Sequence, residues 1–266
     1  MGATPFALVC PSTRGLSLAI TRHLLRTTDL PVFATHRSRD AQDVRDNILS
    51  PLKNVNPDRL RLLHLDLTSE KTMASAAEEL SKTYPNDAKP YLHTAFFCGG
   101  VLHPERRPTD LDREVVEQTF QINVISHLLL MKHFSRFLSP PASNGDKGRA
   151  GKPDLAKWVH VSARVGSISD NRLGGWFSYR ASKAALNQAI HTFDLYLQQK
   201  KIPAICIGTH PGTVKTELSK EFWGGVPENK LFEPEYAAEK LVNVVQGLDE
   251  KSRGRIWDWA GKEVPP

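Results

Sequence analysis

The sequence has 266 residues, of which 40% are hydrophobic and 24% charged, a composition typical of a globular protein with one large core. The net charge of +6 is spread along the chain without a basic stripe interleaved with aromatic residues, so a scattered solvated surface is favoured over nucleic-acid binding. No apolar run approaches the roughly 20 residues that a membrane span requires.

The start of the chain and its cysteines bear on its location. Residues 1–6 lack the charged and apolar regions of a secretory signal, and Phe6 stands where a myristoylation motif has Ser or Thr. The three cysteines, Cys10, Cys98 and Cys206, are far apart and lie mostly in apolar runs. Free buried thiols in a reducing compartment explain them more simply than disulfides do. We therefore expect a cytoplasmic protein without a membrane partner.

Short apolar runs alternate with longer helical patterns along the whole chain. The runs predict strands at residues 6–10, 32–35, 60–66, 91–98, 158–162, 204–209 and 255–257. Helices are expected after the first strand, after Thr68 or Ser69, over 111–138 in one or two pieces, over 177–200, and from Glu233 onward. Residues 139–157 are rich in Pro, Gly, Ser and charged residues and predict a surface loop.

Strands and helices that alternate this regularly predict an α/β fold with helices on both faces of a parallel sheet. Right-handed crossovers make a doubly wound sheet of about seven strands the natural topology. Ligands bind such sheets beyond the carboxyl ends of the strands. The chain shows no internal repeat and no second composition regime, so we expect a single domain over residues 1–266.

The first strand-to-helix turn reads Cys10-Pro11-Ser12-Thr13-Arg14-Gly15-Leu16-Ser17. Such a turn directs amide groups and the positive end of a helix dipole at a pyrophosphate, although this turn alone would indicate only a generic connection. It resembles the turn of the short-chain dehydrogenase/reductase family, Thr-Gly-x-x-x-Gly-x-Gly. Gly15 matches the middle glycine, whereas Pro11 and Ser17 replace the outer two.

Two further segments extend the resemblance to a Rossmann-type, NAD(P)-binding domain. Asp66 matches the family's aspartate beside the adenine ring, and Gly99-Gly100 matches the end of the family's Asn-Asn-Ala-Gly segment. Small residues there let the backbone approach a ribose closely. The resemblance implies cofactor contacts from Pro11, Ser12, Thr13, Arg14, Gly15, Leu16, Arg37, Asp66, Leu67, Cys98, Gly99, Gly100, Tyr179, Lys183, Pro211, Gly212, Val214 and Thr216.

The charges near the second strand bear on the choice between NAD and NADP. An acidic residue at the end of that strand would bind a free ribose 2′-hydroxyl and repel a 2′-phosphate. Residues 34–37 read Ala-Thr-His-Arg, and no acid occurs before Asp40. Arg14 and Arg37, each an ordinary surface residue when taken alone, flank the expected position of the phosphate. The pair favours NADP(H).

Tyr179 and Lys183 are four residues apart at the start of a helix and therefore lie on the same face. This spacing is frequent by chance, but residues 179–187 closely resemble the family's Tyr-x-Ala-Ser-Lys-x-Ala segment. A cationic lysine near a phenol is expected to lower the phenol pKa, which assists proton transfer near neutral pH. The resemblance implies that Tyr179 is the acid/base and that Lys183 also holds the nicotinamide ribose.

The resemblance implies two further members of the catalytic set. Asn123 matches the family's helix asparagine, which connects the lysine through water to solvent; by itself it would indicate a kink or a surface position. The family's second serine, which binds the substrate oxygen, is Ala163 here. Ser162 is the expected substitute, with Ser167 and Ser169 as alternatives. Loss of one oxygen-binding donor would cost roughly 3 kcal/mol of transition-state stabilisation.

Residues 211–216 read Pro-Gly-Thr-Val-Lys-Thr and resemble the family's Pro-Gly-x-x-x-Thr, in which the backbone meets the nicotinamide carboxamide and Thr216 would contact the diphosphate. The segment at about 214–232, with Phe222, Trp223 and two glycines, predicts either a mobile substrate lid or an ordinary long loop. Residues 166–168, 174–176 and 257–262 are similar to the C-factor and Sniffer-type carbonyl reductases.

These residues together predict an NADP(H)-dependent oxidoreductase that transfers hydride between NADPH and a small or medium carbonyl or alcohol substrate. The expected partner is that small molecule rather than nucleic acid, and no metal site is expected. The family's usual interface at residues 111–138 and 177–200 implies a homodimer or homotetramer. The alternative is a catalytically weak or inactive NADP-binding regulatory or signalling protein, because Pro11, Ser17 and Ala163 depart from the family pattern.

Overall fold

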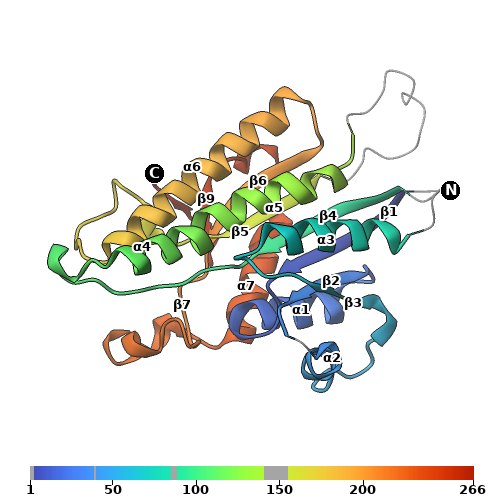
Figure 1. Ribbon diagram of the computed structural model, residues 1–266, viewed down its shortest axis with the longest axis horizontal. Helices are drawn as coiled ribbons and strands as arrows, with labels where there is room; N and C mark the ends of the chain where they lie inside the picture. The colour runs from blue at the N-terminus through green and yellow to red at the C-terminus, as the bar shows by residue number, and fades with distance from the viewer. Residues whose placement is uncertain (1–2, 39, 85–88, 141–154) are drawn as a thin grey trace.

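A computed structural model describes residues 3–38, 40–84, 89–140 and 155–266, and Figure 1 shows its central sheet between two layers of helices. The sheet contains eight strands, namely β1 (Ala3–Cys10), β2 (Val32–His36), β3 (Leu60–His64), β4 (Lys89–Phe97), β5 (Ala156–Val161), β6 (Ala204–His210), β9 (Ile256–Asp258) and β10 (Glu263–Val264). Their order is β10-β9-β6-β5-β4-β1-β2-β3. The chain order reverses at β1, which pairs in parallel with both β2 and β4, and doubly wound sheets bind ligands beyond the strand ends at such a point.

Helices cover both faces of the sheet (Figure 1). They are α1 (Gly15–Thr27), α2 (Ala41–Leu49), α3 (Glu70–Lys82), α4 (Arg113–Phe120), α5 (Ser126–Phe134), α6 (Phe177–Gln199) and α7 (Pro234–Gly247). One apolar core includes side chains of α3, α5 and α6, and the other includes side chains of α1, α2 and α7. β1 supplies Phe6 and Leu8 to the first core and Ala7 and Val9 to the second, as alternation along a strand requires. The predicted doubly wound α/β fold is confirmed.

The sheet has one strand more than expected. β10 pairs antiparallel with β9 after a turn in which Gly261 has a φ of +75°. The Oδ1 atom of Asp258 accepts hydrogen bonds from the amides of Ala260 and Lys262 and closes this turn. A strand of two residues has too few positions to show a periodic pattern, so the sequence did not reveal it.

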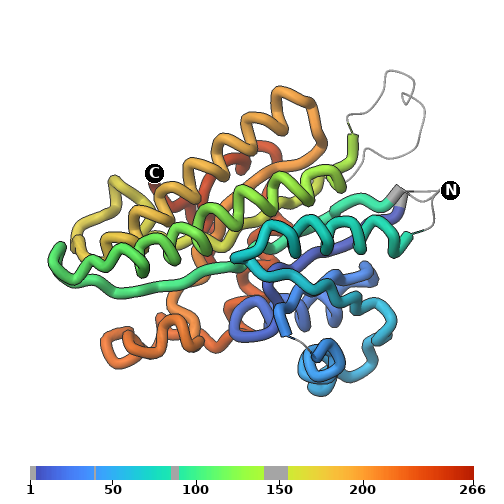
Figure 2. Tube along the Cα trace, in the orientation of Figure 1, coloured from blue at the N-terminus to red at the C-terminus, as the bar shows by residue number. Residues whose placement is uncertain are grey.

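Several boundaries also differ from those expected. The helix predicted over 111–138 contains a π-helical turn, η3 (Gln121–Ile125), between α4 and α5, and the pieces run in nearly the same direction (Figure 2). β3 ends at His64, so Asp66 lies in the following turn. β5 begins at Ala156, inside the predicted loop at 139–157, and residues 141–154 of that loop lie outside the described residues.

The three cysteines are free, as expected. Cys10 and Cys206 are buried, and Cys98 is partly buried at the end of β4. Within the part of the chain that the structure describes, none of the helices combines the length and apolar character of a membrane span.

A polar chain of ring nitrogens crosses the core between β5 and α5. Trp158 Nε1 donates to His160 Nε2 at 2.8 Å, and His160 Nδ1 lies 2.7 Å from His127 Nδ1. His127 Nε2 lies 3.0 Å from the carbonyl oxygen of Gly99. Because an indole nitrogen can only donate, neutral histidines fit one arrangement, in which each ring donates onward until Gly99 accepts. This row of hydrogen bonds therefore connects the core to the segment that follows β4.

Both histidines are fully buried, and burial is the main cause that lowers their pKa values, with the nearby Lys183 as a further cause. The pKa of His127 falls to about 3. The folded protein thus holds these rings neutral over the pH range in which the unfolded chain protonates them, below the ordinary value of 6.5. Their contribution to stability is complete above that value and is lost as the pH falls below 6.5, toward 3 in the case of His127.

We predict that the free energy of unfolding decreases between pH 6 and pH 5 with a slope of about 1.4 kcal/mol per pH unit from each buried histidine. Chemical denaturation at several pH values measures this slope. His127→Gln should reduce it by one group's share, whereas His191→Gln, on an exposed position of α6, should leave it unchanged. Identical slopes in the wild type and in His127→Gln would contradict the assignment.

Candidate active site

The first turn lies where the resemblance placed a pyrophosphate site, between β1 and α1. Ser12 is buried, and both its amide and its Oγ donate to the carbonyl oxygen of Thr35 in β2, at 3.0 and 2.9 Å. Gly15 has a φ of +54°, and a Cβ added there would stand 2.9 Å from Cγ2 of Thr216. The turn therefore packs directly against the segment that follows β6. The predicted cofactor residues of the first turn therefore meet those that follow β6, although the two groups are far apart in the sequence.

The two arginines proposed for a 2′-phosphate are exposed, and neither forms an ion pair with any other described residue. Arg37 follows β2 directly and is near enough to Asp66 to contribute to lowering the pKa of that carboxyl. The larger cause of this low pKa is hydrogen bonding from the Thr68 amide and hydroxyl, at 2.8 and 2.7 Å. Asp40 is used as the N-cap of α2, where it accepts hydrogen bonds from two amides.

Gly99 and Gly100 follow β4 and lie between the first turn and α6. A Cβ on Gly99 would lie 2.5 Å from Cδ1 of Leu67, so only glycine fits without a shift. A Cβ on Gly100 would lie 3.6 Å from Lys183 Nζ and 3.7 Å from Asn123 Oδ1. The structure thus brings these five predicted residues together. Cys98, just before them, donates its amide to the Cys10 carbonyl at 2.6 Å and links the ends of β4 and β1.

Asn123 is fully buried inside the π-helical turn η3, which rules out the surface position that remained open from sequence. Its Oδ1 accepts from the Val101 amide at 2.8 Å. Its Nδ2 donates to the Val101 carbonyl and to Ser182 Oγ, both at 3.0 Å. Asn123 thereby ties the loop after β4 to α6, next to Lys183.

Tyr179 and Lys183 lie on the inner face of α6 and are 8% and 2% exposed. The Lys183 Nζ is 5.8 Å from the centre of the Tyr179 ring and donates to the Val161 carbonyl at the end of β5, at 3.0 Å. Burial raises the pKa of Tyr179 to about 12 and lowers the pKa of Lys183 to about 8. The expected lowering of the phenol pKa is therefore wrong for the isolated chain, because burial disfavours the charged phenolate.

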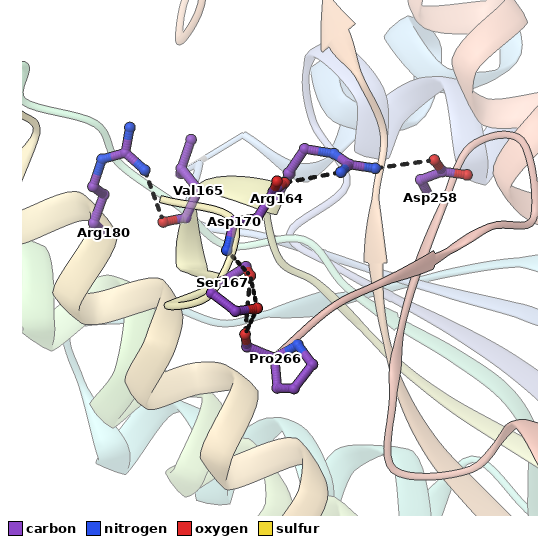
Figure 3. Close-up of polar contacts among 8 residues, drawn as sticks. Arg164, Val165, Ser167, Asp170, Arg180, Asp258 and Pro266 are labelled. Atoms are coloured by element: carbon purple, nitrogen blue, oxygen red, sulfur yellow. Dashed lines mark hydrogen bonds and ion pairs between the residues drawn. The ribbon is translucent and has the colours of Figure 1, made fainter. Parts of the chain in front are cut away.

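Ser162 is 2% exposed, and its Oγ donates to Asn187 Oδ1 at 2.6 Å. The two alternative serines point elsewhere: Ser167 Oγ and Ser169 Oγ both donate to the carbonyl oxygen of Pro266, as Figure 3 shows for Ser167. The same segment is held from the other side by Arg164, whose guanidinium reaches Asp170 at 2.9 Å and Asp258 at 3.4 Å (Figure 3). The hydroxyls of all three serines are therefore engaged in hydrogen bonds within the chain, and the role of Ser162 stays a prediction.

The segment after β6 is more ordered than a long loop. β7 (Thr213–Val214) pairs in parallel with β8 (Leu231–Phe232), and 3₁₀ turns η6 (Lys220–Gly225) and η7 (Glu228–Lys230) lie between them. Gly212 has a φ of +75° and would, with a Cβ, stand 2.7 Å from the Phe232 ring. Pro211, Gly212 and Val214 therefore lead from β6 into a small two-stranded sheet. Phe222 in η6 contacts Trp176 beside Tyr179.

Sequence reasoning missed four residues that shape this site. His127 and His160 reach the Gly99 carbonyl through the core, and Trp176 contacts the Tyr179 ring. Asn187 binds Ser162, although it belongs to the helix segment that the resemblance covered. Trp176 and Asn187 lie in segments that carry the resemblance, but their contacts, like those of the two histidines, join separate elements and follow only from the fold. Among the described residues, no cluster of His, Cys, Asp and Glu could hold a metal ion.

Comparison with known proteins agrees with this geometry. Residues 5–225 match the family model described as short chain dehydrogenase. C-signal of Myxococcus xanthus is 30% identical over 156 residues, which are 59% of this chain and 81% of C-signal. The carbonyl reductase Sniffer of D. melanogaster is 22% identical with a TM-score of 0.79, and an NADPH-bound carbonyl reductase from chicken fatty liver is 23% identical with a TM-score of 0.80. Each alignment with these two structures covers 100% of both chains.

The two solved structures share the fold, and the family match covers the first turn, Asn123, Tyr179 and Lys183. The chain belongs to the short-chain dehydrogenase/reductase family of oxidoreductases and, with C-signal as a relative 30% identical, is of its C-factor-like type.

Proposed function

We propose that this chain transfers hydride between NADPH and a carbonyl or alcohol substrate, with Tyr179 as the acid/base. The observation that carries the proposal is the buried pair on α6, in which the Lys183 ammonium lies 5.8 Å from the centre of the Tyr179 ring. The Lys183 ammonium faces Gly100, where a Cβ would lie 3.6 Å from Nζ and where a cofactor ribose could approach. A proton donor, a cation and a backbone cradle thus meet beyond the carboxyl ends of the strands.

The residues around this pair fit NADP(H). Arg14 and Arg37 are exposed after β1 and β2, and neither forms an ion pair within 4.0 Å with a described carboxylate, although Arg37 lies near Asp66. Their guanidinium groups could therefore bind a 2′-phosphate. Asp66 would lie beside the adenine, and the turn at Gly15 and Thr216 would receive the diphosphate at the start of α1. Similarity to an NADPH-bound carbonyl reductase also supports this cofactor.

The protonation states of the pair suit reduction near neutral pH. With a pKa of about 12, Tyr179 keeps its proton until the substrate oxygen requires one. With a pKa of about 8, Lys183 is largely charged at pH 7 and stabilises the negative charge left on the phenol oxygen. A bound nicotinamide would supply the hydride that forms the new C–H bond. The carbonyl π electrons would pass to oxygen, which would take the proton from Tyr179 and leave an alcohol.

Ser162 is proposed to hold the substrate oxygen in place of the serine missing at Ala163. Its hydroxyl would have to exchange its hydrogen bond with Asn187 for one with the substrate. That exchange favours modest rather than high activity, since a preorganised donor stabilises a transition state best. Because the hydrogen bond between Ser162 and Asn187 occupies the hydroxyl that the reaction would need, it also supports the second candidate function, an NADP-binding regulatory protein with little turnover. NADPH binding without NADPH oxidation across a broad panel of carbonyl compounds would establish that second function.

The surface beside α4 and α6 is a candidate interface for the predicted homodimer or homotetramer. A groove on this face is lined by Leu111, Val116, Phe120, Phe177 and Ala181. Leu111 and Phe177 are exposed hydrophobic residues, which second copies of the chain would cover.

Tyr179→Phe should reduce carbonyl reduction by about 10²–10⁴-fold, because the variant keeps the ring but lacks the proton donor. NADPH binding, measured by titration of the cofactor's fluorescence, should change little. Tyr196→Phe is the matched control, since Tyr196 is an exposed tyrosine of the same helix and should retain full turnover. Undiminished NADPH oxidation by Tyr179→Phe would disprove the acid/base assignment.

Arg37→Ala should weaken NADPH binding by at least about tenfold, because a charge-assisted hydrogen bond to phosphate is lost. Binding of NADH, which has no 2′-phosphate, should be nearly unaffected. The dissociation constants of both cofactors measured by calorimetry test this difference, with Arg26→Ala, an exposed position at the end of α1, as the control. Equal losses for NADPH and NADH would remove the argument for NADP.

A further inference from the structure

His127, in α5, is a buried polar residue that the proposed reaction does not use. Its side chain is fully buried, and its Nε2 lies 3.0 Å from the carbonyl oxygen of Gly99 in the segment that follows β4. Its Nδ1 lies 2.7 Å from Nδ1 of His160, which is equally buried in β5. Burying an unpaired polar group is costly, and these two contacts satisfy both ring nitrogens of His127.

Trp158 sets the direction of the hydrogen bonds through these rings. Its Nε1 donates to His160 Nε2 at 2.8 Å, so the neutral ring of His160 carries its proton on Nδ1 and donates it to His127. The neutral ring of His127 then carries its proton on Nε2, and the Gly99 carbonyl accepts it. This histidine row, formed by Trp158, His160 and His127, therefore holds the Gly99 carbonyl from inside the core.

The row fixes a peptide unit that has no side chains of its own to hold it. Gly99 and Gly100 are consecutive glycines, which have more backbone freedom than any other residue. The peptide bond that joins them is trans, so its N–H points away from its C=O. Because the Gly99 carbonyl is directed at His127, the Gly100 amide is directed to the opposite side of the peptide unit.

The Gly100 amide is an unused donor beside the proposed active site. Gly99 is buried, whereas Gly100 is partly exposed. In the described part of the chain, no acceptor receives a hydrogen bond from the Gly100 amide, although the next amide, that of Val101, donates to Asn123 Oδ1. A Cβ on Gly100 would lie 3.6 Å from Lys183 Nζ, so this donor stands next to the buried ammonium.

We propose that His127 is a positioning residue for the cofactor: its hydrogen bond to Gly99 keeps the peptide turned so that the Gly100 amide can donate to an oxygen of NADP(H). The inference rests on the proposed function, since it concerns the same cofactor, but it does not require hydride transfer. A donor that is oriented before binding costs less conformational entropy than one that the ligand must order. His127 thus raises the affinity for the cofactor from within the core, without touching it.

Two substitutions separate the hydrogen bond of His127 from the bulk of its side chain. His127→Leu removes the donor and should raise the Kd for NADPH about five- to tenfold, the effect of one hydrogen bond. His127→Gln keeps an N–H that can donate to the Gly99 carbonyl, so it should retain most of the affinity. Titration calorimetry measures both dissociation constants without any turnover.

Phe134→Leu is the matched control for loss of core packing. Phe134 is fully buried in the same helix, and its ring contacts Phe137. This variant should unfold at a lower temperature and bind NADPH as the wild type does. Equal weakening of NADPH binding in Phe134→Leu and His127→Leu, or full affinity in His127→Leu, would overturn the positioning role.

NMR of the wild type tests the same geometry if His127→Leu does not fold. Spectra of the chain labelled with ¹⁵N should show His127 with its proton on Nε2, with His127→Gln to identify the signal. Addition of NADPH should move the Gly100 amide proton downfield, as a new hydrogen bond does. A proton on Nδ1 of His127, or a Gly100 amide that NADPH leaves unchanged, would contradict the proposal.

Turnover distinguishes this inference from the proposed function. If the binding and NMR results are as expected but no carbonyl compound is reduced, hydride transfer fails and the positioning role stands. If carbonyl compounds are reduced but His127→Leu binds NADPH like the wild type, the reductase function stands and the positioning role fails. A wild type that does not bind NADPH would overturn both.

Discussion

The buried ammonium of Lys183 is the constraint around which the site is arranged. A cation removed from water is costly unless it has polar partners, and in the isolated chain Lys183 donates one hydrogen bond, to Val161 at the end of β5. Its pKa falls to about 8 because of burial. The absence of a side chain at Gly100 leaves room above the amine, and Asn123 approaches the same point from the π-helical turn. The same charge helps to keep His127 neutral in the core behind it.

Local patterns were sufficient to predict most of the fold, whereas the resemblance to the family indicated the residues that meet in the site. Alternating apolar runs gave the parallel strands, and the spacing of Tyr179 and Lys183 placed both on one helix face, as the structure has them. Local patterns could not show β10, which exists only through pairing with β9, or the π-helical turn around Asn123. The cofactor and catalytic roles of these residues stay predictions.

The pKa of Tyr179 is raised rather than lowered because burial disfavours the phenolate. The cost of burying that charge depends on the three-dimensional packing around Tyr179, which sequence spacing does not show. The contacts of Trp158, His160 and His127 were hidden for the same reason, since they join β5 to α5 across the core. Sequence spacing predicts which residues share an element, whereas desolvation and long-range contacts follow only from the assembled fold.

The most direct test of the account is the titration of Lys183 itself. ¹³C NMR of the chain labelled at the lysine ε-carbons, with the Lys183→Arg variant to identify the signal, reports the pKa of this amine. The account predicts a midpoint near 8, since burial beside Tyr179 disfavours the charged form. A midpoint near the ordinary lysine value of 10.5 would show a solvated amine and would contradict the buried pair.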